Sequence, residues 1–335
     1  MMKLKFVMIG LLLAAPLLAG ETGYHVTARY PVPQPSGFDY LTLDSAARRL
    51  YISHGTQVDV IDADTGKVIG AIGDTPGVHG IAIASEFKHG FISNGLEDKV
   101  SMFDTTTLQL IKKIDVGKGP DGIWYDPGSK RVFTNDKDSE DITAIDAKTA
   151  EVVGTVKIGG NGEEAAIGNG LIYVNVENQA QVVVFDPKSL QIKNHFPIGI
   201  TKPTGLANDA STNRLFIGSN LQSKMAVMDA VSGKVINTFP ICSGVDYASF
   251  DPDAKLIFFS CGDGTLSIYH EKSPDEYEDA GAIKTQATAK TMAFDPKTKK
   301  IFLSAGEYLE TPSADPKRPL RSIKNGSFVV LVVSK

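Results

Sequence analysis

Seven positions in the chain recur about 40 residues apart and carry mostly ionisable side chains. Aligned on the apolar run that follows each one, they are Asp39, His79, Asp121, Glu163, Thr204, Asp246 and Lys290. Carboxylates, an imidazole and an ammonium group that converge on one partly desolvated place perturb one another's pKa values, which is typical of a binding or catalytic site. The alternative is a solvated ring of loop residues whose aspartates cap turns.

A second set of positions follows the next apolar run of each repeat. These positions are His54, Asn94, Asp136, Val176, Ser219, Cys261 and Ala305. In the first three repeats the two sets together give six polar side chains with oxygen and imidazole ligands, which suit Ca²⁺ or a harder transition ion. Such an ion could polarise an ester carbonyl while His79 or His54 acts as the base, which is the chemistry of lactone or ester hydrolysis.

Motifs that would strengthen a catalytic or cofactor interpretation are absent from the sequence. It contains no HExxH, no EF-hand loop and no Cys-His cluster with metal-ligand spacing. It also lacks Cys-x-x-Cys-His, which excludes covalent haem, and a glycine-rich phosphate loop between a strand and a helix. We therefore assign no catalytic residue, no metal ligand and no cofactor from the sequence, with a divalent ion such as Ca²⁺ left as an alternative.

The elements that must position these residues are short strands. Each repeat has apolar runs rich in Val, Ile, Phe and Tyr, separated by Asp, Gly, Pro, Thr and Lys, which is the pattern of an all-β protein. The second run carries an aromatic residue at the same place in every repeat: Tyr51, Phe91, Phe133, Tyr173, Phe216, Phe258 and Phe302. Four strands per unit in seven units predict a seven-bladed β-propeller of four-stranded antiparallel blades.

The two ends of the repeat region predict how the ring closes. Residues 327–333 supply only a third strand for the last blade, and residues 24–32 resemble the fourth strand of the other units. We expect this N-terminal strand to join the C-terminal blade, so that residues 21–335 form a single domain. In such a ring both sets of polar positions open on one face, around the central channel. Trp124, on an innermost strand, is expected to pack in the core.

The first residues indicate export. Residues 1–20 place Lys3 and Lys5 before an apolar run and end in small residues, which predicts a cleaved signal peptide and a periplasmic or secreted protein. The run is too short to span a bilayer comfortably, so no transmembrane segment is expected in the mature chain. The net charge of −5 offers no field that would attract nucleic acid, which makes nucleic acid an unlikely partner.

Cys242 and Cys261 are the two cysteines of the chain. In the propeller register both fall in loops on one face of blade six, one before its first strand and one after its second, within bridging distance. An oxidising compartment favours a structural disulfide over two separate thiols.

An insertion departs from the repeat at residues 306–326. It follows the second strand of blade seven and carries basic residues between Lys317 and Lys324, including Arg318. We expect it to lie over the channel mouth as a lid or a docking loop, against the alternative of a mobile loop without function.

The repeat resembles the YncE-like, YVTN-type family of exported bacterial seven-bladed β-propellers, and the likeness covers everything after the signal. The runs that carry it are Phe38 to Asp44, Arg49 to Gly55, Val58 to Asp62, Pro76 to Ile81, Gly264 to Leu266 and Phe328 to Val333. The namesake tetrapeptide has its nearest match at Tyr173-Val174-Asn175. Membership implies a periplasmic or secreted propeller. Some relatives look like sugar-lactone hydrolases, some resemble haem-binding propellers of electron-transfer enzymes, and the namesake is associated with single-stranded DNA.

The leading interpretation is a non-enzymatic binding or scaffold propeller that holds a small ligand, peptide or periplasmic partner protein at its channel mouth. Its candidate ligand-binding residues are Asp39, His54, His79, Asn94, Asp121, Asp136, Glu163, Asp246, Lys290 and Arg318. The first alternative is a metal-dependent lactonase or related hydrolase. The second is single-stranded DNA binding, for which the stacking and basic residues would be Tyr40, Tyr247, Tyr308, Lys290 and Arg318.

Overall fold

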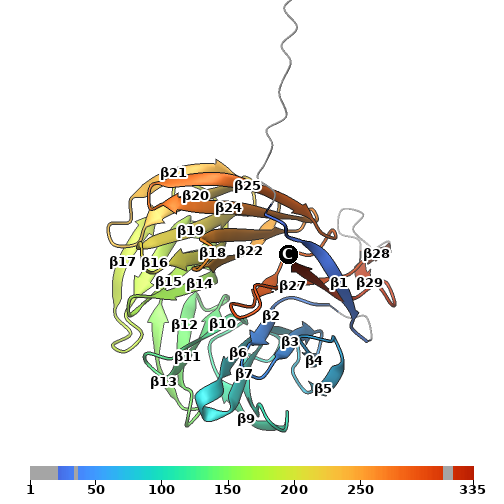
Figure 1. Cartoon of the computed structure of the whole chain (residues 1–335). Coiled ribbons are helices and arrows are strands. Elements are labelled where there is room, and N and C mark those ends of the chain that lie inside the picture. The colour runs from blue at the N-terminus through green and yellow to red at the C-terminus, as the bar shows by residue number, and fades with distance from the viewer. Residues whose placement is uncertain (1–21, 34–36, 312–319) are drawn as a thin grey trace, which may run out of the picture.

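The computed structural model describes residues 22–33, 37–311 and 320–335. The strands form seven four-stranded antiparallel sheets arranged as the blades of a ring (Figure 1). The N-terminal residues 1–20, predicted as a signal peptide, lie outside the described residues. Within the described ranges no helix is long and apolar enough to cross a membrane.

The first three blades are made of consecutive strands. Blade one contains β2 (Leu41–Asp44), β3 (Arg49–His54), β4 (Gln57–Asp62) and β5 (Val68–Ile72). Blade two contains β6 (Val78–Ala84), β7 (His89–Asn94), β8 (Lys99–Asp104) and β9 (Leu110–Asp115), with the short 3₁₀ helix η1 (Ser85–Phe87) between its first strands. Blade three contains β10 (Pro120–Asp126), β11 (Arg131–Asp136), β12 (Asp141–Asp146) and β13 (Val152–Lys157).

Blades four to six repeat this order. Blade four contains β14 (Gly162–Gly168), β15 (Leu171–Val176), β16 (Gln181–Phe185) and β17 (Ile192–Pro197), with η2 (Glu177–Gln179) after β15. Blade five contains β18 (Pro203–Asp209), β19 (Arg214–Ser219), β20 (Lys224–Asp229) and β21 (Val235–Pro240). Blade six contains β22 (Val245–Asp251), β23 (Leu256–Cys261), β24 (Thr265–Ser273) and β25 (Glu276–Lys284).

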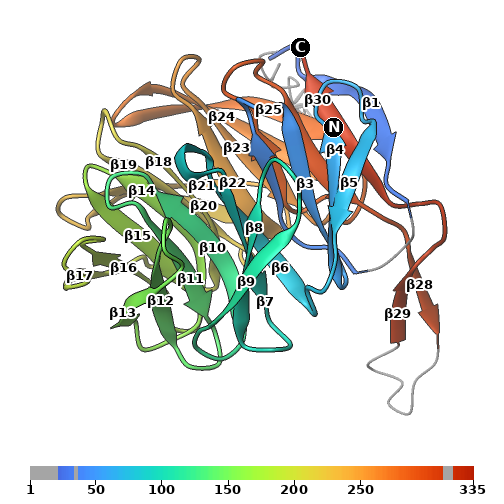
Figure 2. The same ribbon diagram turned by 90° about the horizontal axis from the view of Figure 1, so that it is seen from below.

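Blade seven closes the ring as predicted. Its sheet runs from β26 (Met292–Phe294) through β27 (Ile301–Ala305) and β30 (Val329–Ser334) to β1 (His25–Pro31), so both ends of the repeat region share one sheet. The insertion adds a separate hairpin of β28 (Tyr308–Thr311) and β29 (Leu320–Ile323). Figure 2 shows this hairpin standing off the body of the propeller.

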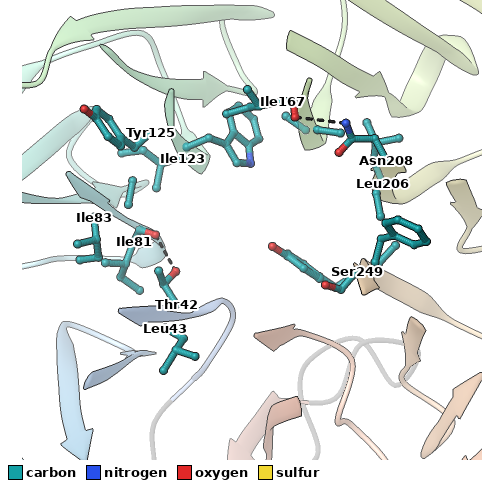
Figure 3. A pocket seen from close by; sticks show the side chains of 18 residues that line it. Thr42, Leu43, Ile81, Ile83, Ile123, Tyr125, Ile167, Leu206, Asn208 and Ser249 are labelled. Atoms are coloured by element: carbon teal, nitrogen blue, oxygen red, sulfur yellow. Dashed lines mark hydrogen bonds between the residues drawn. The ribbon is translucent and has the colours of Figure 1, made fainter. Parts of the chain in front are cut away.

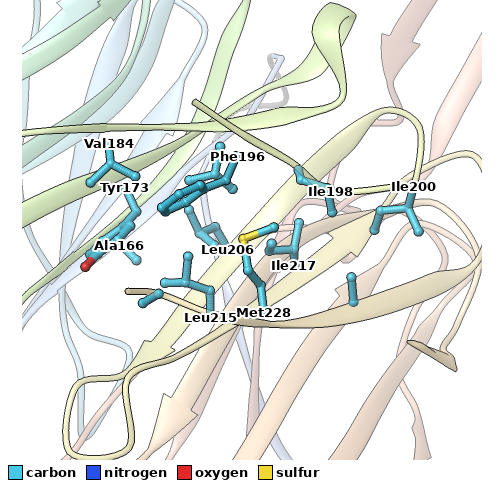
Figure 4. Close-up of a cluster of buried hydrophobic side chains, with 13 residues drawn as sticks. Ala166, Tyr173, Val184, Phe196, Ile198, Ile200, Leu206, Leu215, Ile217 and Met228 are labelled. Atoms are coloured by element: carbon cyan, nitrogen blue, oxygen red, sulfur yellow. The ribbon is translucent and has the colours of Figure 1, made fainter. Parts of the chain in front are cut away.

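The core lies between the blades. All seven repeated aromatic residues of the second strands are buried, with at most 3% of their surface exposed. Figure 4 shows one contact between blades, where Tyr173 and Val184 of blade four pack against Leu215 and Met228 of blade five. Each blade therefore depends on its neighbours to bury both faces, which explains why the repeat needs a closed ring.

The turns after the third strands are fixed by the recurring aspartates. Asp62 accepts hydrogen bonds from the backbone N–H groups of Asp64 and Thr65, at 3.1 and 2.8 Å. The same pair of bonds recurs at Asp104, Asp146, Asp186 and Asp229. These carboxylates are turn residues because their oxygens satisfy N–H groups that the strands leave unpaired.

Candidate functional site

A β-bulge positions the side chains at the mouth of the central channel. In β6 the pairing with β7 shifts between Val78 and Ile81, so that His79 and Gly80 together lie opposite the single residue Ser93. The same shift occurs near the start of β10, β14, β18 and β22. A bulge turns a side chain out of the alternation of its strand, which is how the first residue of each bulge comes to face the mouth.

Glycine follows the bulged residue where neighbouring innermost strands approach closely. A Cβ atom on Gly80 would lie 3.0 Å from the carbonyl oxygen of Asp121, and one on Gly205 would lie 2.9 Å from the carbonyl carbon of Tyr247. A side chain at either position would force the strands apart. The close approach brings bulged side chains of adjacent blades within bonding distance of one another.

Seven charged side chains at the mouth form one unbroken chain of ion pairs. In order they are Asp246, Lys290, Asp39, His79, Asp121, Lys137 and Glu163. The nitrogen to oxygen distances along this chain are 2.6, 3.7, 2.8, 3.6, 2.6 and 2.9 Å. Each nitrogen-bearing group therefore lies between two carboxylates. We call this set the charged mouth; it borders a cavity of about 110 Å³.

The hydrogen bond between His79 and Asp39 favours the charged form of both groups. Burial alone would raise the pKa of Asp39, but the bond from His79 and the nearby Lys290 ammonium lower it below its usual value. Burial opposes a charge on His79, yet the bond to Asp39 and the charge of Asp121 raise its pKa. A protonated imidazole cannot accept a proton, so the network disfavours His79 as a general base.

The two lysines of the mouth stay charged for the same reason. Burial would lower the pKa of Lys137, but Asp121 and Glu163 raise it, and Asp246 and Asp39 do the same for Lys290. Burial raises the pKa of Glu163 to about 8 despite the Lys137 ammonium. The acids of the mouth thus differ in how firmly they hold their charge.

Three predicted site residues lie elsewhere. His54, Asn94 and Asp136 are at most 3% exposed and point into their own blades. Each bonds to the third strand of its blade; the partners are Asp59, Ser101 and Thr143, at 2.6, 2.7 and 2.6 Å. Burial raises the pKa of Asp136 to about 7. The structure does not bring these side chains together with Asp39, His79 and Asp121.

The sequence register for this second set was one residue early. Successive side chains of a strand point to opposite sides, so a shift of one residue exchanges the side that faces the mouth for the side that faces the blade. The next positions are Gly55, Gly95, Lys137, Glu177, Asn220, Gly262 and Gly306. Lys137, Glu177 and Asn220 do line the mouth, whereas the glycines of blades one, two, six and seven add no side chain to it.

Below the charged mouth the channel holds a residue that the sequence analysis missed. Glu164 is 3% exposed, and its Oε1 accepts a hydrogen bond from Trp124 Nε1 at 2.9 Å. Trp124 packs against the buried cluster between blades three and four, but it also lines the channel, so its prediction as a core residue was incomplete. Tyr40 and Tyr247 meet edge to face beside them, with ring centroids 6.2 Å apart.

The remaining predicted residues lie around the mouth or outside it. Cys242 and Cys261 are joined in a disulfide in blade six. Arg318 lies outside the described residues. We expected the insertion to lie over the channel mouth, but its described part does not cross the channel. It projects beside blades seven and one (Figures 1 and 2). Its base is held by Phe38, which stacks on Tyr308 and Phe328 at centroid distances of 6.2 and 4.8 Å.

Three of the mouth residues have the composition of a metal site. One ligand atom each from Asp39, His79 and Asp121 lie within 4.8 Å of one another. Carboxylate and imidazole ligands fit a divalent transition ion or Ca²⁺ completed by water. His79 and Lys137 already compensate these carboxylates, so an ion would have to displace both contacts.

The fold and the charged mouth define a seven-bladed propeller with a polar channel opening. The sequence matches the family described as YNCE-like beta-propeller over residues 65–294. The protein belongs to this family, as the sequence resemblance predicted.

A curated relative is Antigen Lp49 of Leptospira interrogans serogroup Icterohaemorrhagiae serovar copenhageni (strain Fiocruz L1-130). The two chains are 26% identical over 192 residues, which cover 52% of this chain and 41% of the relative. The chain thus spans less than half the length of that relative.

Solved structures with the same fold come from unrelated assemblies. A chain of Kuenenia stuttgartiensis hydrazine synthase matches with a TM-score of 0.69 and 17% identity, over 81% of this chain and 94% of that one. A chain of the mitotic checkpoint complex gives 0.74 and 15%, over 97% and 99%. The RRP9 WD40 repeats give 0.76 and 10%, over 94% and 99%. At these identities the likeness concerns the fold alone.

Proposed function

We propose that this protein is an exported binding propeller whose charged mouth holds a small zwitterionic molecule or the charged end of a peptide. The observation that carries the proposal is the alternation of acids and cations around one opening. A ligand with both charges can replace the internal ion pairs of the mouth: its ammonium group can bind the carboxylates, and its carboxylate group can bind the cations. A ligand with one charge would leave part of the network unpaired.

The size of the opening supports a small head group. Its cavity of about 110 Å³ has room for a few water molecules, and on four blades the residue after the second strand is glycine, which adds no further side chain to the opening. The rest of a longer ligand, such as a peptide or a partner's loop, would extend outward. Export is part of the proposal; it is supported by the pattern of residues 1–20, by the family and by a relative described as an antigen.

The test is calorimetric titration of the protein with amino acids, betaines and dipeptides, with simple amines and carboxylates for comparison. We expect a zwitterion to bind at least about tenfold more tightly than either singly charged analogue, because each charge-assisted hydrogen bond contributes on the order of 1.5–3 kcal/mol. Asp39→Asn, which keeps the size of the side chain, should weaken this binding.

The control is Lys99→Met, which removes an ammonium group from an exposed pair with Asp115. It should leave zwitterion binding unchanged. Equal affinity for zwitterions and singly charged analogues, or binding that Asp39→Asn leaves intact, would contradict the proposal.

A metal-dependent lactone hydrolase is the second candidate, favoured by the grouping of Asp39, His79 and Asp121. An ion held by the carboxylates of Asp39 and Asp121 would compensate the charges that now raise the pKa of His79, and His79 could then act as the base beside the ion. The test compares thermal unfolding after chelation and after addition of Ca²⁺ or other divalent ions. An increase in Tm that Asp121→Asn abolishes, together with turnover of a lactone, would support this candidate; no increase with any ion would exclude it.

A further inference from the structure

The half of the channel away from the charged mouth is a chamber of about 490 Å³. Most of its side chains are apolar, and Figure 3 shows Ile81 and Leu206 on opposite sides of its open centre. Two of its polar side chains are engaged between blades. Thr42 donates a hydrogen bond to the carbonyl oxygen of Ile81 at 2.7 Å, and Asn208 donates to that of Ile167 at 3.2 Å.

Toward the mouth the chamber narrows to a cavity of about 30 Å³. Trp124 and Tyr247 line both spaces, and Tyr40 and Glu164 line the narrow one. A group of the size of water needs roughly 10–15 Å³ of such space. The narrow end therefore admits one ammonium group, whereas a trimethylammonium group is too large.

Glu164 presents an unsatisfied carboxylate oxygen at this narrow end. Its Oε1 is occupied by Trp124 and by the backbone N–H of Ala165, but its buried Oε2 has no hydrogen-bond partner among the described residues. Burial raises the pKa of Glu164 to about 8, and no cation is among the main influences on it. A charged carboxylate without a partner is costly in a buried place, so Glu164 keeps its proton up to about pH 8, and a bound ammonium group would stabilise the charged form in place of that proton.

We propose that the chamber binds a small primary amine, with its ammonium group at Glu164 Oε2 and a compact, mainly apolar body in the chamber. The rings of Tyr40, Trp124 and Tyr247 around the narrow end add cation–π attraction. The charged mouth is a poorer place for such a ligand because its carboxylates already have cationic partners. Charge, volume and aromatic lining thus select the same chemical class.

Trp124 is the only tryptophan in the sequence, so its fluorescence reports on this site. The experiment is a titration of the protein with phenethylamine, followed by tryptophan fluorescence and by calorimetry. We expect a saturable change in fluorescence. The neutral analogue 2-phenylethanol should bind at least about tenfold more weakly, and Glu164→Gln should weaken the amine by about the same factor.

The matched control is Glu271→Gln. Glu271 is also a buried glutamate whose pKa burial raises, to about 7, but it does not line the chamber or its narrow end. This variant should leave the amine affinity unchanged. Circular dichroism shows whether each variant is folded. No saturable signal with phenethylamine, equal affinity for the alcohol, or full binding by folded Glu164→Gln would overturn the proposal, whatever the charged mouth binds.

Discussion

The two ends of the channel are built from the same innermost strands, yet they differ in whether their acidic side chains have cationic partners. Glu163 and Glu164 are neighbours in β14. Glu163 faces the charged mouth and pairs with Lys137, whereas Glu164 lies deeper and has no ion pair with a described residue. Burial raises the pKa of both to about 8. The polar end of the channel thus pairs its charges internally, whereas the end lined mostly by apolar side chains holds one acid without a cationic partner among the described residues.

The largest change in stability is expected when Lys137 is removed from the charged mouth. Lys137→Met leaves Asp121 and Glu163 without their ammonium partner in a partly desolvated place. We expect the free energy of unfolding to fall by about 3 kcal/mol at neutral pH. Protonation of Glu163 limits the loss, because its pKa is already high. Urea unfolding measures the change.

Lys99→Met is the comparison for this variant, since its partner Asp115 is 88% exposed. Its free energy of unfolding should stay close to that of the wild type. If the two variants were equally stable, the charged mouth would be no better paired than an ordinary surface.

The unpaired carboxylate should make stability depend on pH in a defined direction. The pKa of Glu164 in the folded protein is about 8, above the value of about 4.5 of a free glutamate, so the folded state binds the extra proton. The stability that this provides is complete below about pH 4.5 and is lost as the pH rises through 8. Glu164→Gln should therefore be more stable than the wild type at pH 9, by at least about 2 kcal/mol, and similar at pH 4.5.

Thermal unfolding of both proteins from pH 4.5 to 9 measures this difference. Taking the difference between variant and wild type removes the contribution of Glu163, which titrates in the same range. A difference in Tm that stays constant with pH would mean that Glu164 keeps its charge throughout and that the chamber end is already satisfied.

Much of the fold could be predicted from the sequence because all seven repeats share the same pattern of apolar and turn residues. The buried aromatic residue of each second strand, from Tyr51 to Phe302, fixes the register, and residues 24–32 match the missing fourth strand of blade seven. The residues at or just before the start of each innermost strand, such as Asp39 and His79, were likewise predicted at the mouth. They precede the long apolar runs, so their place follows from the repeat.

The rest of the site depends on details that composition does not reveal. Whether Asp136 or Lys137 faces the mouth depends on the residue at which β11 ends. The repeat pattern in the sequence does not fix that end to within one residue. Glu164 was missed because it directly follows the bulged Glu163, so in the sequence the two glutamates look like one acidic pair at the mouth. An acidic residue within an innermost strand, 40 positions after Trp124 in the repeat, was the available signal.

A smaller effect is expected at the histidine of the mouth. Asp39→Asn keeps the size of the side chain but removes the charge that His79 bonds, so the pKa of His79 should fall. Because the folded-state pKa of His79 is raised, the stability from this pair is present at low pH and is lost as the pH rises through that pKa. NMR titration of the imidazole gives the shift, and an unchanged pKa would show that Asp121 alone supports the charge.

The smallest effect should come from the edge of the mouth. Lys202 bonds Glu177 at 3.2 Å, but its side chain is 39% exposed and the pair stands outside the chain of seven charges. Solvent screens such a pair, so Lys202→Met should change the free energy of unfolding by less than about 0.5 kcal/mol in urea unfolding. Comparing the stability lost in Lys202→Met with the stability lost in Lys137→Met shows where the desolvated part of the mouth ends. Equal losses would extend it to blade five and enlarge the surface on which a zwitterionic ligand has to match charges.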